Sequence, residues 1–210
     1  PTKNTVNFKS SFSLNNAYFS KFNLQGAVSE YNHSERTGSG NNHNINFFSD
    51  LYEIKTSLNH NSIIDVNSEG LIGFHFHNYD QGALGQEESH LVHTRTSSFA
   101  LFALESFNFD LFDLDVGGRL ESVNLRNTSM EKGFFPGAFS STIKREVFTN
   151  NTIFGGFDFT ERAPNAVELF ANGPHHALEQ FEVGDSNIGV ETSYNFSLGY
   201  SYNDGLDTLK

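Results

Sequence analysis

The segment Asp110-Leu-Phe-Asp-Leu-Asp-Val-Gly-Gly-Arg-Leu-Glu-Ser-Val123 alternates between apolar and polar side chains. The apolar members take even positions and the charged members odd positions: Phe112, Leu114, Val116 and Leu120 against Asp113, Asp115, Arg119 and Glu121. Successive side chains of a β-strand point to opposite faces of the sheet. The period of two therefore predicts a strand with one apolar face and one polar face.

The same alternation recurs along the chain and predicts about nine strands. They lie near residues 5–14, 19–32, 47–59, 63–77, 95–106, 108–124, 138–148, 151–160 and 191–203. Many of them reach the roughly 9–11 residues that a tilted strand needs to cross a bilayer. The 23 Phe and 7 Tyr agree with this prediction, because aromatic side chains favour a pleated surface.

The connections between these strands alternate in length. Short turns are expected near Asn15–Ser20, Asn59–Ser62, Ser106–Asn108 and Thr149–Asn151, and long polar links near 33–46, 78–94, 125–137 and 161–190. Bacterial outer-membrane barrels have tight periplasmic turns and longer extracellular loops. We therefore predict an all-β fold, an up-and-down antiparallel transmembrane β-barrel. Two packed sheets of a soluble sandwich are the alternative.

Composition and motifs exclude several other classes. No run of about 18 apolar residues occurs, so a helical membrane span is excluded. A formal net charge of −12 argues against nucleic-acid binding, and the absence of Cys removes thiol chemistry. The chain has no Gly-x-Ser-x-Gly or His-Glu-x-x-His motif, so we do not expect an enzyme.

The stretch Phe157–Tyr200 contains four short motifs in a characteristic order. They are Glu161-Arg-Ala-Pro164, Glu168-Leu-Phe-Ala-Asn-Gly-Pro-His175, Gly184-Asp-Ser-Asn187 and Glu191-Thr-Ser193. Together they resemble the distal barrel region of TonB-dependent receptors. Residues 31–53 and 82–105 are similar to the branch of that family associated with zinc or iron-complex uptake, and the resemblance covers roughly residues 20–203.

The resemblance implies a barrel of about 22 strands around a plug. About nine strands cannot close such a ring, so we expect residues 1–210 to be a fragment of the barrel domain, without the plug domain and closing strands. Such a fragment would be an open sheet with two exposed edges, a form prone to aggregation. The resemblance also implies energy coupling through the TonB complex, which engages the plug.

Histidines are informative here because imidazole binds transition metals. His75 and His77 lie on a predicted strand whose apolar face holds Phe74 and Phe76, so both rings should face the polar side. Their Cα atoms would lie about 7 Å apart, close enough to share one ion. We therefore predict a metal site at His75 and His77.

Further His and Glu side chains are expected on the extracellular loops, where they would contact an incoming ligand. These candidate ligand-binding residues are His33, Glu35, Glu87, His90, His93, His175 and His176. The alternative is that they are ordinary polar residues of wet loops. Arg162, Pro164 and Gly173 are interpreted as residues that shape a loop, and His60 is expected in a short turn.

Together these features predict an outer-membrane receptor that takes up a scarce metal or metal chelate by TonB-dependent transport. Zinc is favoured over haem or a ferric siderophore because of the His-rich loops. The expected partners are the TonB complex, outer-membrane lipid and the transported ligand, with no tightly bound cofactor. A passive outer-membrane pore and a soluble β-sandwich binding module remain the alternatives.

Overall fold

The structure is a computed structural model and describes residues 1–36, 44–62, 67–85, 90–175, 178–203 and 208–209. Its elements are β1 (Thr2–Ser13), β2 (Phe19–Arg36), β3 (Asn44–His60), β4 (Ser68–Gly85), β5 (Thr94–Asn108), β6 (Asp113–Arg126), β7 (Glu131–Phe134), β8 (Gly137–Phe148), β9 (Asn151–Arg162), α1 (Ala166–Phe170), β10 (Asn172–His175), β11 (Gln180–Val183), β12 (Glu191–Asn203) and β13 (Thr208–Leu209). Within the described ranges, no helix is long and apolar enough to cross a membrane.

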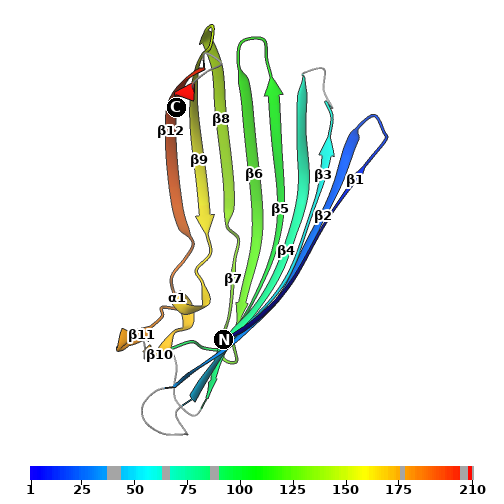
Figure 1. Cartoon of the computed structure of the whole chain (residues 1–210). Helices are drawn as coiled ribbons and strands as arrows, with labels where there is room; N and C mark the ends of the chain where they lie inside the picture. The colour runs from blue at the N-terminus through cyan, green and yellow to red at the C-terminus, as the bar shows by residue number, and fades with distance from the viewer. Residues whose placement is uncertain (37–43, 63–66, 86–89, 176–177, 204–207, 210) are drawn as a thin grey trace.

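One antiparallel sheet of 11 strands contains most of the chain (Figure 1). Its strands follow the sequence order from β1 to β13, apart from the small insert that carries α1, β10 and β11. β7 pairs with the last four residues of β6 and β8 pairs with residues 113–120, so β7 and β8 form one interrupted neighbour of β6. The predicted up-and-down order of about nine long strands is confirmed.

The outer face of this sheet is apolar and exposed. We define it by the alternate positions that the register aligns across the strands: Val6, Val28, Ile54, Ile72, Phe99, Leu120, Phe139, Ile153 and Phe196. Leu120 is 74% exposed and Phe196 76% exposed. In the described part of the chain no second sheet covers this face, so the sandwich alternative is wrong. An apolar surface of this extent is typical of a membrane or protein interface.

The opposite, inner face is largely polar. It carries Glu53, His75, Ser98, Arg119 and Asp158, which alternate with the outer-face residues along their strands. Charged residues of β6 are hydrogen-bonded to the neighbouring strand β5: Asp115 accepts a hydrogen bond from Ser106 (2.5 Å) and Asp113 accepts one from Asn108 (2.7 Å).

Several predicted strand boundaries are wrong at the end where the connections are long, which we call the loop end. β4 continues to Gly85 because its polar second half pairs with both β3 and β5. His75 and His77 therefore lie in the middle of a strand, not near its outer end. The predicted link 125–137 is wrong as well, because it contains β7 and only a tight turn closed by the hydrogen bond from Asn127 N to Met130 O (3.0 Å).

The link predicted over 161–190 is an ordered insert. Asn165 is the N-cap of the helix α1. Its side chain accepts hydrogen bonds from the backbone N–H groups of Val167 and Glu168, and the Glu168 side chain accepts one from the backbone N–H of Asn165. This capping box satisfies the free N–H groups of the first turn. It explains why so short a helix forms in a chain otherwise rich in strands.

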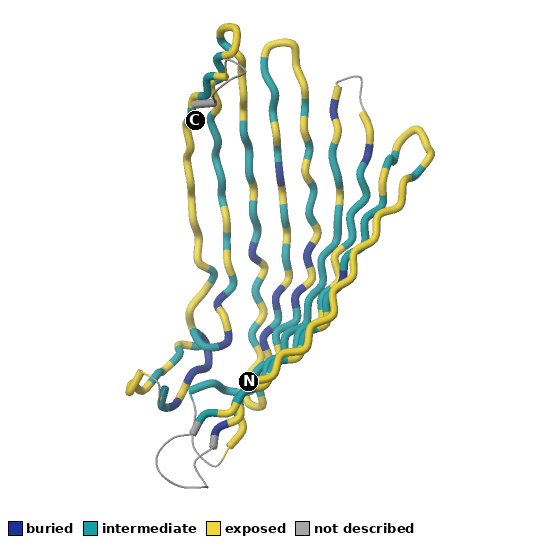
Figure 2. The backbone as a smooth tube through the Cα atoms, viewed as in Figure 1, coloured by how far each residue is buried: buried dark blue, intermediate teal, exposed yellow. Residues whose placement is uncertain are grey.

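The insert packs on the inner face at the loop end (Figure 1). Leu169 and Phe170 of α1 contact Val123 and Leu125 of β6 in a small apolar core, and Leu125 is only 1% exposed. Figure 2 shows buried residues in α1 and in the loop-end part of the neighbouring strands. The inner face is thus apolar where the helix covers it and largely polar along the rest of the strands, where a few apolar residues such as Leu71, Phe102 and Leu104 also lie.

Candidate metal site

The hairpin of β10 and β11 carries two side chains of the types that can bind a metal, His175 and Glu182. His175 pairs with Gln180 and Gly173 with Glu182, so His175 and Glu182 are diagonal neighbours across the two strands. The hairpin is fixed to α1 by hydrogen bonds from Gly184 N to Ala171 O (2.7 Å) and from Asp185 N to the carbonyl oxygen of Glu168 (2.8 Å). Its position therefore depends on the helix and its core.

A third side chain reaches this hairpin from the connection between β4 and β5. His90 N donates to Pro174 O (3.2 Å), and Asn172 N donates to His90 O (3.3 Å). These two backbone hydrogen bonds dock residue 90 beside β10. His90 and His175, far apart in sequence, are consequently held side by side.

The three groups form a compact cluster. The rings of His90 and His175 are stacked with centroids 4.2 Å apart. His175 Nδ1 lies 2.7 Å from Glu182 Oε1, and His90 Nε2 lies 3.9 Å from Glu182 Oε2. One ligand atom from each residue lies within 4.8 Å of the others. Ligands of tetrahedral zinc are about 3.3 Å apart, so small side-chain movements would close the site around an ion.

The electrostatics of the cluster favour a cation. The hydrogen bond from His175 lowers the pKa of the Glu182 carboxyl, and the nearby His90 and His175 rings act in the same direction. Glu182 is therefore an anion at neutral pH. Because the side chains of all three residues are partly exposed, an ion can reach them and keep positions for water or a chelator.

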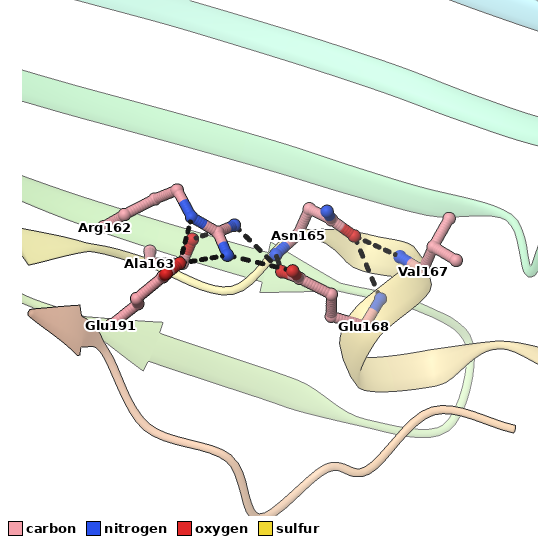
Figure 3. Close-up of polar contacts among 6 residues, drawn as sticks. All are labelled: Arg162, Ala163, Asn165, Val167, Glu168 and Glu191. Carbon is pink, nitrogen blue, oxygen red and sulfur yellow. Dashed lines mark hydrogen bonds and ion pairs between the residues drawn. The ribbon is translucent and has the colours of Figure 1, made fainter.

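Arg162 forms ion pairs with Glu168 and Glu191, which we call the Arg162 clamp (Figure 3). Its guanidinium donates to both oxygens of Glu168 (2.9 Å each) and to Glu191 Oε2 (2.9 Å from Nε and 2.7 Å from Nη2). Arg162 ends β9, Glu191 begins β12 and Glu168 lies on α1. One side chain thus joins both ends of the insert to its helix, whereas the sequence had suggested only a loop-shaping residue.

The structure brings together two of the predicted ligand-binding residues, His90 and His175. It adds Glu182, which the sequence analysis missed, although the alternation in Gln180–Val183 was a signal for a short strand. Glu87 and His176 lie outside the described residues.

The other predicted loop residues lie elsewhere. His33 and Glu35 are on β2, not on a loop, because β2 continues to residue 36; their side chains lie 3.3 Å apart, and His33 stacks on Phe47. His93 pairs with Asp80 at 2.6 Å on the outer face. His60 ends β3 and pairs with Glu105 at 2.7 Å.

His75 and His77 do share the inner face, with ring centroids 5.6 Å apart. Both nitrogens of His75 have partners: Nε2 lies 2.7 Å from Glu53 Oε1, and Nδ1 lies 3.3 Å from Arg119 Nη2. Arg119 also binds Glu121, which accepts a hydrogen bond from Ser98. The adjacent guanidinium disfavours a second cation beside His75 and His77, whereas no arginine or lysine contact is found at His90 and His175 among the described residues.

An open antiparallel sheet with an apolar outer face and a polar inner face defines the wall of a membrane β-barrel. The family model described as "TonB dependent receptor-like, beta-barrel" matches residues 2–210, and the chain belongs to this family. A similar solved structure is a protein named "Copper transporter OprC", with a TM-score of 0.72 and 13% identity. The alignment covers 96% of this chain and 37% of that protein, so the chain spans little more than a third of its length.

Proposed function

We propose that this chain forms part of the barrel wall of an outer-membrane receptor that takes up a transition metal, free or as a small chelate, by TonB-dependent transport. The observation that carries the proposal is the cluster of His90, His175 and Glu182 at the loop end, beside the polar inner face. Family membership supports the barrel and the energised mechanism. The exposed apolar outer face supports the membrane location.

Zinc is the metal we propose. Two imidazole nitrogens and one carboxylate form a ligand set that zinc commonly uses, with a fourth position left for water or a chelator. Copper(II) binds the same donor types and generally more tightly, so it is the competing cargo. We propose His75 and His77, on the inner face in the middle of β4, as a second and weaker contact for the metal after it leaves the cluster at the loop end.

The test is zinc titration of the purified full-length receptor by calorimetry, repeated with copper(II), haem and a ferric siderophore. His175→Ala should weaken zinc binding at least about tenfold, and Glu182→Gln should also weaken it. His93→Gln is the matched control, because this imidazole lies on the outer face. Unchanged zinc affinity in both site variants would overturn the metal site.

A passive pore is separated from an energised receptor by uptake in cells. Zinc accumulation at limiting concentration should depend on the receptor and should stop when TonB is deleted. Uptake that persists without TonB would identify a pore. If the cluster binds zinc but uptake does not need TonB, the metal-site proposal stands and only the TonB-dependent mechanism is rejected.

A further inference from the structure

A row of charged side chains crosses the outer face where its apolar band ends. The register places four of them directly beside one another on successive strands: Asp80, Arg95, Arg126 and Glu131. They lie at the loop end, and apolar outer-face residues such as Phe99 and Leu120 follow toward the middle of the same strands. The row therefore marks the border between the apolar band and water.

Two arginines are direct neighbours in this row. Like charges directly opposite each other on adjacent strands are unfavourable unless an anion is shared. Asp80 is already engaged, because it accepts two hydrogen bonds from Arg95 (3.1 and 2.7 Å) and one from His93 (2.6 Å). Glu131 accepts from the Asn124 side chain (2.9 Å). Within the described part of the chain, Arg126 forms no ion pair.

A hollow of about 500 Å³ lies over these side chains. Its lining includes the carboxylates of Asp80 and Glu131, which already accept hydrogen bonds, and five residues with hydrogen-bond donors: Arg95, Arg126, His93, Ser97 and Asn124. Arginine binds phosphate through paired N–H groups in a plane. Two guanidiniums and neighbouring amide and hydroxyl donors suit a phosphate group that approaches from outside the barrel.

We propose that Arg95 and Arg126 bind the phosphate of an outer-leaflet glycolipid whose acyl chains lie along the outer face. The inference rests on the membrane location given under the proposed function, but not on metal transport. The start of the apolar band beside the hollow favours a lipid over free phosphate: Phe99 is the next outer-face residue after Ser97 on β5 and is 47% exposed. Juxtamembrane basic residues recognise anionic lipid headgroups in the same way.

The test uses the full-length receptor in detergent with three probes: phosphorylated lipid A, enzymatically dephosphorylated lipid A and inorganic phosphate. The double variant Arg95→Gln with Arg126→Gln removes the two cations. The control is Arg145→Gln, an outward-facing arginine at the opposite end of the sheet. Native mass spectrometry measures the retained lipid, and zinc titration measures the metal site.

The wild type and the control should retain phosphorylated lipid A at least about tenfold better than the double variant, and inorganic phosphate should not displace it. Dephosphorylation should abolish the preference. Equal retention by the double variant and the control would overturn the proposal, as would displacement by millimolar phosphate, which would show a free-phosphate site. Unchanged zinc binding in the double variant separates this result from the metal proposal.

Discussion

The imidazole rings of His90 and His175 are stacked 4.2 Å apart with an interplanar angle of 18°, although they lie 85 positions apart in sequence. A metal binds only an unprotonated imidazole nitrogen, so zinc and protons compete for the same ring nitrogens. Zinc affinity at this cluster should therefore fall as the pH is lowered from about 8 to about 5.5. Zinc titration across this range measures the effect, and an affinity that does not change with pH would contradict the proposal.

The hydrogen bond between His175 and Glu182 should make the hairpin pH-dependent. Because the folded protein lowers the pKa of Glu182, this carboxylate stabilises the hairpin above its unfolded pKa of about 4.3. The contribution is lost as the pH falls through the lower, folded value. The protection of β10 and β11 amides from hydrogen exchange, relative to their intrinsic exchange rates, should therefore fall in the wild type as the pH passes below the ordinary range of a Glu carboxyl. In Glu182→Gln, exchange should already be fast at neutral pH and change less.

Arg162 should affect zinc binding only by holding the insert in place, because it contacts Glu168 and Glu191 but none of the three proposed metal ligands. We expect Arg162→Gln to loosen the insert and weaken zinc binding about five- to tenfold. Barrel stability should change little, because these ion pairs are exposed to solvent and screened by it. Limited proteolysis within residues 163–190 should become faster. The same exchange at Arg145 is the control, and equal proteolysis in both variants would contradict the clamp.

The guanidinium of Arg119 should control the weaker contact at His75 and His77. Arg119→Gln removes the cation next to His75 Nδ1, so a second, weaker zinc-binding event should gain affinity several-fold. The loss of the bonds to Glu121 should also lower the free energy of unfolding by about 1 kcal/mol. Adding His75→Ala and His77→Ala should abolish that second event. Its persistence would exclude these histidines.

Gly70 should tolerate no side chain. It lies between His60 and Glu105 in the register, and a Cβ there would lie 2.5 Å from the Leu104 carbonyl oxygen. Gly70→Ala is expected to lower the free energy of unfolding by about 1–3 kcal/mol. Gly118→Ala, where nothing lies within 4 Å, should change it by less than about 0.5 kcal/mol. Urea unfolding in detergent compares the two variants.

The faces of the sheet were predictable because alternation is a local property. The odd positions of β6 all face inward, as the period of two requires. At Val123 and Leu125, beneath α1, these inward side chains are apolar instead of polar. No local pattern predicts that α1 packs over these two residues, because the helix lies about 40 residues further along the chain.

The strand type, the apolar and polar faces and the family could all be read from the sequence. Which histidines lie close together depends on the tertiary structure. His75 and His77 are neighbours through the geometry of one strand, so their spacing could be read directly. His90 lies beside His175 and Glu182 because two backbone hydrogen bonds join the connection between β4 and β5 to β10. The capping box and the Arg162 clamp hold the insert that carries β10 and β11. Such long-range contacts depend on the folded path of the chain and leave no periodic signal in the sequence.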